Sequence, residues 1–246
     1  MSTAIVITSG KGGTGKTSLT AGVGSCLAAL GKRVLCIDMD IGLRNLDLSL
    51  GLSDRALMDF TDVLTGRCSL EKAAVAHPVI QGLSLITAPV TLPSESLSEH
   101  AMRDMIRQAK VQYDFILMDS PAGLGEGFQL ACCGADRAVV VSTTDASALR
   151  DAQRTVTLLR GTLPRIHLVV NRVQPKLLRR LHTTIDDAMD AAGLPLLGIV
   201  PEDPQVMLCA NREQPLILCA NRGAATAYLN IAKRLLGQKA PLMRLR

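Results

Sequence analysis

Short apolar runs rich in β-branched residues recur along the chain, separated by polar or glycine-rich stretches. Within each run the residues are almost continuously apolar rather than alternating with polar ones. This pattern is typical of parallel strands that helices cover on both faces. Seven strands are predicted on this basis: Ala4–Thr8, Arg33–Ile37, Leu83–Thr87, Phe115–Met118, Ala138–Ser142, Ile166–Val170 and Leu196–Val200.

Several segments between these runs place apolar residues at helical spacing. Ser96 and Glu99 have the spacing of a capping box and predict a helix over residues 97–111. Further helices are predicted from Leu19, Val23, Cys26, Leu27 and Leu30, from Leu177, Leu181, Ile185 and Ala188, and over Ala224–Leu236. Strands and helices therefore alternate along the whole chain.

This alternation predicts an α/β fold with three layers, in which a doubly wound, mostly parallel sheet carries helices on both faces. No linker, repeat or low-complexity stretch divides the chain. A single domain is therefore predicted over residues 1–236, followed by a short basic C-terminal tail over residues 237–246. Ligands of such sheets bind at the carboxyl ends of the strands, so functional residues are expected directly after the strands.

Composition and charge limit the kinds of molecule that the chain is expected to bind. Only 2% of the 246 residues are aromatic, which is too few for the clustered platforms on which nucleic-acid bases stack. The net charge is +5. Five basic residues near the C-terminus account for it, since the remainder has 22 basic and 22 acidic residues; they are Lys233, Arg234, Lys239, Arg244 and Arg246. A local basic end is therefore expected, and no nucleic-acid partner.

The cysteines and the N-terminus indicate the compartment. The seven cysteines include no Cys-x-x-Cys pair, so reduced thiols are expected rather than a zinc site or a disulfide framework. The N-terminus lacks the basic region of a signal peptide, and no apolar run reaches the ~18 residues of a membrane span. The chain is therefore expected to be cytoplasmic.

The first predicted strand leads directly into Gly10-Lys-Gly-Gly-Thr-Gly-Lys16-Thr17, which matches G-x-x-x-x-G-K-[ST] at every fixed position. Glycines let backbone N–H groups converge on phosphate oxygens, and the helix that follows adds its positive dipole end. Lys16 is expected to neutralise the β- and γ-phosphates, and the Thr17 hydroxyl to bind Mg²⁺. The nucleotide-binding residues predicted here are Gly10, Lys11, Gly12, Gly13, Thr14, Gly15, Lys16, Thr17 and Ser18.

Acidic residues follow two of the predicted strands. Asp119 ends the run Phe115–Met118, where a carboxylate beside the phosphate loop suits a Walker B acid that holds Mg²⁺ through water. Asp38 and Asp40 are two residues apart, which on an extended segment places both side chains on one side. One of them would serve the metal and the other would orient the attacking water. Gly123 follows closely and suits a switch that senses the γ-phosphate.

Two further polar residues have positions that suit a nucleotide site. Lys11 lies on the outer arm of the glycine-rich loop, from which it cannot easily fold back onto the phosphate that Lys16 neutralises. It is well placed to reach a nucleotide on a facing subunit. Asn171 follows the strand Ile166–Val170, and its amide can both donate to and accept from the edge of an adenine base.

With these motifs the chain resembles the MinD/ParA family of deviant Walker A P-loop ATPases, and Lys11 is at the position of that family's signature lysine. The segment Asp38-Met-Asp-Ile-Gly-Leu-Arg-Asn-Leu-Asp47 is similar to switch I of the MinD branch rather than to the ParA form. Asp119-Ser-Pro-Ala-Gly123 resembles switch II. Pro201-Glu-Asp-Pro204 and Glu213-Gln-Pro215 fit the C-terminal region of the family, so the resemblance covers residues 2 to about 236.

The resemblance implies further roles for individual residues. It assigns activation of water to Asp40 and a place in the Mg²⁺ shell to Asp38, beside the catalytic lysines Lys11 and Lys16. It also implies a second group of site residues: Asn45 and Gly123 in the switches, Asn171 and Arg172 at the base, Pro201 and Asp203 beside the base, and Arg150 and Asp151 on the face that binds partner proteins.

The function implied is an ATPase switch that uses ATP and Mg²⁺ and forms a homodimer when ATP is bound, with Lys11 reaching the phosphates of the other subunit. MinC-like and MinE-like proteins would be its partners in placing the division site. Two alternatives remain, a ParA-like positioning ATPase on DNA and a nucleotide-gated scaffold with incidental hydrolysis. The neutral body of the chain and its switch I count against the first of these.

The C-terminal tail suggests a membrane contact. Leu242, Met243 and Leu245 alternate with Arg244 and Arg246, which would place three apolar side chains in an interface and two cations at anionic headgroups. Weak binding to an anionic membrane is expected, with the chain peripheral on the inner face of the cell membrane. A disordered basic tail fits the same residues equally well.

Overall fold

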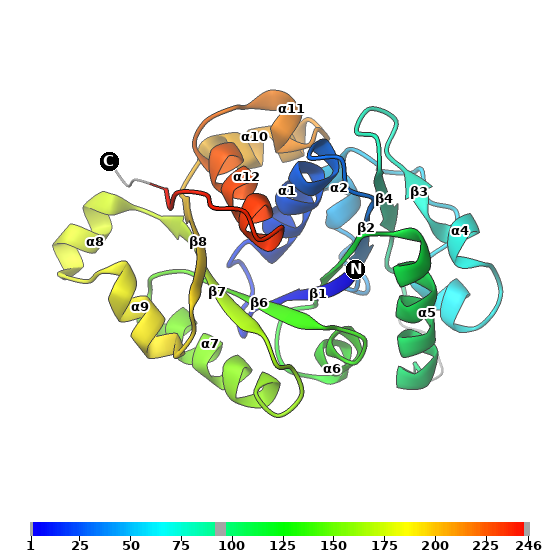
Figure 1. The fold of residues 1–246 in the computed structure, drawn as a ribbon, viewed down its shortest axis with the longest axis horizontal. Helices are drawn as coiled ribbons and strands as arrows, with labels where there is room; N and C mark the ends of the chain where they lie inside the picture. The colour runs from blue at the N-terminus through cyan, green and yellow to red at the C-terminus, as the bar shows by residue number, and fades with distance from the viewer. Residues whose placement is uncertain (1, 92–96, 244–246) are drawn as a thin grey trace.

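The computed structural model describes residues 2–91 and 97–243 and contains one eight-stranded sheet (Figure 1). Its strands are β1 (Thr3–Thr8), β2 (Val34–Asp38), β3 (Val75–Ala76), β4 (Leu83–Ile86), β5 (Phe115–Asp119), β6 (Arg137–Ser142), β7 (Ile166–Val173) and β8 (Leu196–Pro201). Their order is β3-β4-β2-β5-β1-β6-β7-β8. All neighbouring pairs are parallel except β3 and β4, which are antiparallel.

All seven predicted strands are confirmed, with small shifts at their ends. The exception in length is β7, which continues to Val173, three residues beyond the predicted end. Its register with β8 is irregular between Val170 and Val173. Asn171 therefore lies within the strand rather than after it. The pattern did not predict β3, because two residues are too short to show a period.

Helices cover both faces of the sheet, as the alternation predicted. They are α1 (Lys16–Ala29), α2 (Leu46–Leu50), α3 (Phe60–Leu64), α4 (Leu70–Ala73), α5 (Glu99–Gln112), α6 (Glu126–Cys132), α7 (Ala146–Leu159), α8 (Pro175–Leu181), α9 (Ile185–Ala192), α10 (Pro204–Asn211), α11 (Leu216–Cys219) and α12 (Ala224–Leu235). Residues of α1, α2, α10, α11 and α12 pack on one face, and residues of α5, α6, α7 and α9 pack on the other (Figure 1). None of the helices in the described part of the chain is both long and apolar enough to cross a membrane.

Two of the helix predictions need correction. The helix expected over residues 97–111 begins at Glu99, and Ser98 caps it by accepting from the amide of Ala101. Ser96 lies outside the described residues. The apolar spacing from Leu177 to Ala188 does not form one helix, because His182 takes a left-handed conformation between α8 and α9. The apolar period passes through this break, which is why the sequence did not reveal it.

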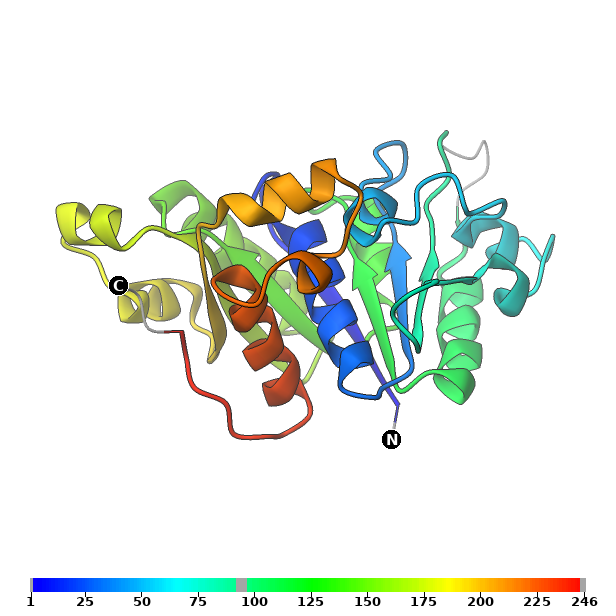
Figure 2. The ribbon, with the colours of Figure 1, turned by 90° about the horizontal axis from the view of Figure 1, so that it is seen from above.

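The sheet brings the ends of distant segments to one edge. Figure 2 shows the central strands pointing towards the edge along which α10 lies. The loops after β1, β2, β5, β7 and β8 therefore meet there. These loops carry the residues that the sequence analysis singled out, and the core beneath them is aliphatic and buried on both faces of the sheet.

Candidate nucleotide-binding site

The glycine-rich segment forms a loop between β1 and α1, as predicted. Gly15 is the N-terminal cap of α1 and has φ +89°, a left-handed conformation that favours glycine. A Cβ at Gly15 would also overlap the side-chain amide of Asn171. The Thr14 hydroxyl is buried without a hydrogen-bond partner among the described residues. A buried orphan hydroxyl beside a helix N-terminus fits a site that receives an anionic ligand.

Lys16 opens α1 and is only 7% exposed. Burial lowers the pKa of its ammonium group, and the carboxylates of Asp119 and Asp40 partly offset this effect. A buried cation next to the glycine-rich loop is disposed to bind the phosphates of a nucleotide. Ser18, the last of the predicted nucleotide-binding residues of this segment, is half-buried in the first turn of α1.

Asp38 and Asp119 lie directly opposite each other at the ends of the neighbouring strands β2 and β5. Each is 1% exposed. Burial, followed by the repulsion of Asp38, raises the pKa of Asp119 to about 7, while hydrogen bonds from Thr17 and Thr20 lower it. Burial also raises the pKa of Asp38 to about 6. Two buried carboxyl groups this close together fit a site that a divalent cation completes.

The donors beside the glycine-rich loop are few and belong to strand ends and to the start of α1. Within the described residues, no group of three or more His, Cys, Asp and Glu side chains could hold a metal ion by itself. Mg²⁺ usually keeps several waters and binds one or two carboxylates together with substrate phosphates. Asp119 and Asp38, with the Thr17 hydroxyl that helps to lower the pKa of Asp119, are the donors of this kind beside the loop. The residues present therefore fit Mg²⁺ that enters with a nucleotide.

Asp38 is the last residue of β2, and Asp40 follows it in the loop. The Asp38 carboxylate accepts from the backbone amides of Asp40 at 2.9 Å and Leu46 at 3.1 Å. That the two side chains lie on one side stays a prediction. Asp40 is half-buried, and the charge of Lys16 opposes the effect of burial on its pKa. The buried Asp38 thus holds the backbone of the loop between β2 and α2, while Asp40 lies near Lys16.

The remaining switch residues lie in the loops that follow β2 and β5. Asn45 is the N-terminal cap position of α2, next to the amide that Asp38 binds, although its side chain makes no capping hydrogen bond. Gly123 lies between β5 and α6 with φ +89°. Both segments therefore border the site, which is the placement that a nucleotide-sensitive switch needs.

Asn171 and Arg172 both bind the glycine-rich loop from β7. The Asn171 Nδ2 donates to the carbonyl of Thr14 at 2.8 Å. The Arg172 Nη1 donates to the carbonyl of Gly13 at 3.1 Å, and its guanidinium pairs with Glu202 at 2.9 Å. These side chains brace the loop, a role that the sequence analysis did not anticipate. Their predicted contact with the base remains a prediction.

Pro201 and Asp203 lie where β8 passes into α10. Pro201 is the last residue of β8 and pairs with Val173. The Asp203 carboxylate accepts from the amide of Gln205 at 3.0 Å and from that of Ala224 at 2.9 Å. Asp203 therefore fixes the starts of both α10 and α12. Glu202 of this segment pairs with Arg172 and lines one cavity with the loop, and the predicted role of Pro201 and Asp203 beside the base stays a prediction.

Lys11 contacts the start of α7 in its own chain. Its Nζ donates to the Ser147 Oγ at 2.7 Å and lies 3.4 Å from the Asp145 Oδ1. Hydrogen bonds from Thr143, Ser147 and the amide of Ala148 hold the pKa of Asp145 below its ordinary value. The sequence analysis did not identify Asp145 or Ser147 as site residues. The signal was present in Asp145, which stands as a helix cap after a buried strand.

The loop also packs directly against the middle of α7. A Cβ at Gly10 would overlap the carbonyl of Asp151, so the two backbones approach each other closely. The Asp151 carboxylate pairs with Arg154 at 3.6 Å, and Arg150 is exposed. The predicted partner face therefore lies in direct contact with the glycine-rich loop. The structure brings these residues together, although about 140 residues of sequence separate them.

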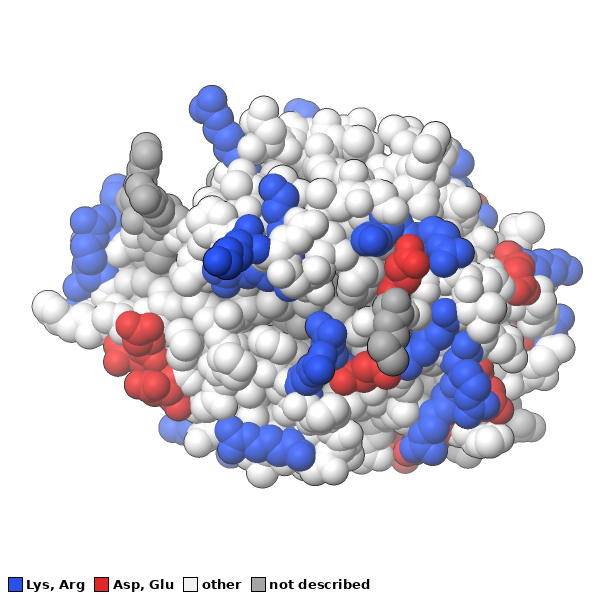
Figure 3. Space-filling view, in the orientation of Figure 1, with Lys and Arg blue, Asp and Glu red and all other residues white. Residues whose placement is uncertain are grey.

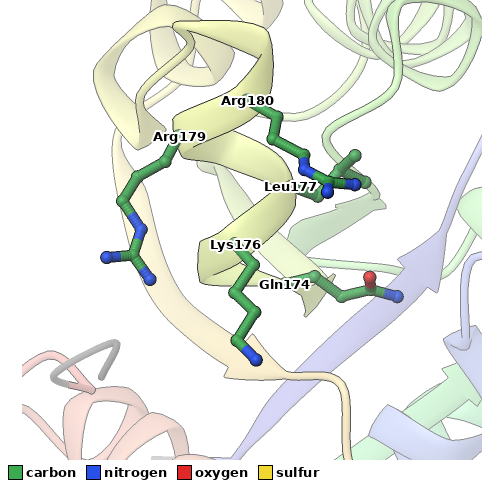
Figure 4. A pocket seen from close by; sticks show the side chains of 5 residues that line it. All are labelled: Gln174, Lys176, Leu177, Arg179 and Arg180. Carbon is green, nitrogen blue, oxygen red and sulfur yellow. The ribbon is translucent and has the colours of Figure 1, made fainter.

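A cavity of about 400 Å³ opens on the outer side of the loop and includes Lys11, Thr14 and Arg172 among its lining residues. A second cavity adjoins it at α8, where Gln174 and Leu177 line both. Figure 4 shows Gln174, Leu177 and Arg180 pointing to one side of α8 and Arg179 to the other. On the face shown in Figure 3, basic and acidic side chains are interspersed and form no single extended basic surface.

Comparisons with known proteins match these observations. Residues 5–216 match the model of the CobQ/CobB/MinD/ParA nucleotide binding domain. The chain is 41% identical to the septum site-determining protein MinD of Bacillus subtilis, with 98% of this chain and 92% of the relative covered. It is similar to MinD in the MinC:MinD complex of Aquifex aeolicus, with a TM-score of 0.92, 40% identity and 99% of both chains covered. It also resembles MinD of Pyrococcus horikoshii complexed with Mg-ADP, with a TM-score of 0.84, 29% identity and 96% of both chains covered.

Proposed function

Because the chain belongs to the septum site-determining MinD proteins of the CobQ/CobB/MinD/ParA nucleotide-binding family, we propose that it acts as an ATP-driven switch that places the division site. It is a nucleotide-binding ATPase that uses ATP and Mg²⁺. The observation that carries the proposal is the site itself, in which the buried Lys16 lies by the loop and the opposed carboxylates of Asp38 and Asp119 lie at adjacent strand ends.

We propose the following division of roles within the site. Lys16 and the backbone of the loop bind the phosphates, while Thr17, Asp38 and Asp119 hold Mg²⁺ directly or through water. When bound, Mg²⁺ supplies positive charge that offsets the charge of the phosphates. Asp40 orients the attacking water, and its position near Lys16 supports this role. Positioning and charge neutralisation then carry most of the catalysis.

The dimer is a proposal that rests on Lys11. Its ammonium group lies on the outer arm of the loop and points to α7 rather than to the phosphate site of its own chain. A lysine in this position is free to exchange its acceptors on α7 for the phosphates of a facing subunit. ATP would then hold two subunits together, and hydrolysis would release them.

The partner face is proposed on α7. One solved structure similar to this chain is a complex of MinC with MinD, which supports a MinC-like partner. The exposed Arg150 and the half-buried Asp151 lie on the helix that carries the acceptors of Lys11 and packs against Gly10. A change at the phosphates is therefore transmitted to the surface on which a partner would dock. A MinE-like activator that docks on α7 would act on the phosphate site through the same contact between α7 and the loop.

We place the chain in the cytoplasm, peripheral on the inner face of the cell membrane, and assign the contact with anionic lipid to the C-terminal tail. Arg244, Leu245 and Arg246 lie outside the described residues, whereas Leu242 and Met243 lie within them. One short tail contributes little binding energy, since each basic residue adds about 1 kcal/mol near an anionic surface. Two tails on an ATP-bound dimer would bind much better through their effective concentration.

A substitution of the phosphate-binding lysine tests the proposed function. Lys16→Ala removes a buried cation, and charge-assisted hydrogen bonds contribute about 1.5–3 kcal/mol, so ATP affinity should fall by about 10- to 100-fold. Isothermal titration calorimetry with Mg-ATP measures this change, and a phosphate-release assay measures turnover. Lys72→Ala on α4 removes the same charge from an exposed position and is the matched control. Equal ATP affinity in both variants would refute the proposed site.

A further inference from the structure

The C-terminal tail does not extend freely away from the body of the protein. α12 ends at Leu235, and Gly237 turns the chain with φ +77°. The tail then runs back beside α12 towards β8 in both views (Figures 1 and 2). β8 is the last strand of the sheet, so among residues 2–91 and 97–243 one of its edges has no neighbouring strand. The tail therefore lies against the edge strand of the sheet. Covering an edge strand limits its pairing with other chains.

Arg234 fastens the tail to this edge. Its Nε and Nη2 donate to the carbonyl of Ala240 at 3.1 and 2.9 Å. Its Nη1 donates to the carbonyl of Leu197 in β8 at 3.1 Å. One guanidinium thus joins a carbonyl of the tail to a carbonyl of the edge strand. The planar fork of arginine makes this possible, because a lysine ammonium on its flexible stem does not present donors in that geometry.

The apolar side chains of the tail complete the contact. Pro241, Leu242 and Met243 line a small cavity together with Gly198 and Ile199 of β8. Met243 packs against the core clusters on both faces of the sheet, so it wraps the edge of β8. Leu242 is 41% exposed and lies on the outer side of this contact. Met243 is therefore held against the sheet, whereas Leu242 is held there only in part.

We propose that Leu242 and Met243 have two alternative partners, the edge of β8 and the interface of an anionic bilayer, and that Arg234 holds them on β8. This inference rests on the proposed membrane contact of the tail. The same side chain cannot be buried in both places, so lipid binding must first displace the tail from the sheet. Arg234 is thus a positioning residue that weakens membrane binding, even though its charge alone would favour it.

A tryptophan placed in the tail reports its position, because the chain has no native tryptophan. Leu242→Trp is the reporter background, since this side chain is partly exposed and its replacement leaves the core unchanged. Arg234→Gln removes the guanidinium that joins the carbonyls of Ala240 and Leu197. Arg234→Lys keeps the positive charge but loses the planar arrangement of N–H donors. Lys233→Gln is the matched control, because it removes the same charge from the neighbouring position of α12. Met243→Ser weakens the contact of the tail with the sheet without a substitution in α12. Thermal melting shows that each variant is folded.

Fluorescence is measured first without lipid. Arg234→Gln, Arg234→Lys and Met243→Ser should shift the tryptophan emission to the red and make it more accessible to acrylamide, whereas Lys233→Gln should not. Vesicles of phosphatidylglycerol and phosphatidylcholine are then added, with ATP and Mg²⁺ present. Arg234→Gln should bind them about tenfold more tightly than Lys233→Gln, the factor that corresponds to 1.4 kcal/mol, and phosphatidylcholine vesicles alone should bind neither.

The outcomes separate the two proposals. Emission and quenching that are identical in all variants without lipid would show that Arg234 does not hold the tail, and this overturns the inference. Release of the tail by Arg234→Gln with no vesicle binding by any variant would instead overturn the membrane contact, and with it the exchange between two partners. Equal vesicle affinity of Arg234→Gln and Lys233→Gln would show that only charge matters, which also contradicts the inference.

Discussion

The Lys11 ammonium donates to the Ser147 hydroxyl at 2.7 Å, so a lysine of the phosphate loop binds the first turn of α7 in the same chain. Ser147 in turn donates to the Asp145 carboxylate at 2.7 Å. The three side chains form a polar chain between the loop and the helix of the proposed partner face. Because Lys11 is about half exposed, the contact can be exchanged for a stronger anionic acceptor without unfolding the site.

Replacement of this lysine should separate nucleotide binding from dimerisation. Lys11→Ala should bind Mg-ATP with nearly normal affinity, because Lys16 and the loop backbone remain, but it should lose ATP-dependent dimerisation and turnover. Calorimetry gives the affinity, and size-exclusion chromatography with light scattering in ATP and in ADP gives the mass. Ser147→Ala removes the nearer of the two acceptors of Lys11 in the same chain, leaves Asp145 in place, and should still dimerise with ATP. A Lys11→Ala variant that dimerises and hydrolyses normally would rule out a role in trans.

Replacement of Asp40 should have the opposite effect. Asp40→Ala should bind ATP and form the dimer but hydrolyse poorly, because the group proposed to orient water is missing. General-base assistance is typically worth a factor of about 100 or more, so turnover should fall by at least that much where Asp40 acts in this way. Single-turnover hydrolysis measures the loss, and light scattering should show that the ATP-bound dimer persists. Asp40→Asn keeps the shape of the side chain, and unchanged turnover in both variants would assign the water to another group.

Seven of the strands could be predicted because most of their residues are buried, with helices on both faces of the sheet, and they therefore form nearly continuous apolar runs. The phosphate loop could be predicted because its chemistry depends on a local spacing of glycine, lysine and threonine. The contact of Lys11 with Ser147 could not, since 136 residues separate the two and only the fold brings α7 to the loop. The break at His182 was hidden for another reason: its left-handed conformation interrupts the backbone while the apolar spacing continues.

The contact of Asn171 with the glycine-rich loop could not be predicted from the sequence either, because β7 is far from the loop along the chain. One of the two amide hydrogens of Asn171 is used by the carbonyl of Thr14, which leaves the second hydrogen and Oδ1 for a contact with the base. Asn171→Ala should therefore weaken the binding of ATP and of inorganic triphosphate alike, by about fivefold for a hydrogen bond of about 1 kcal/mol. Asn171→Asp removes the donor but keeps an oxygen at the base. Calorimetry with ATP, GTP and triphosphate resolves the two roles. A loss confined to ATP would indicate a base contact alone and would contradict the bracing role.

The glycine-rich loop packs closely on α7 at Gly10, which leaves little room for a larger residue there. A methyl group added at Gly10 would overlap the carbonyl of Asp151, whereas one added at Gly12 would meet the Cβ of Ala122 at 3.8 Å, an ordinary contact distance. Gly10→Ala should therefore lower the free energy of unfolding by about 1–3 kcal/mol, the usual cost of overpacking. Gly12→Ala should change it by less than about 0.5 kcal/mol on this account.

Urea denaturation followed by circular dichroism measures both variants, and calorimetry measures their affinity for Mg-ATP. Since α7 must move away from the loop to admit the added methyl group, Gly10→Ala should also weaken the contact of Lys11 with Ser147. The NMR signals of α7 should then shift in Gly10→Ala and stay in place in Gly12→Ala. Equal stability and equal α7 signals in the two variants would show that the loop and the partner face are not coupled through this contact.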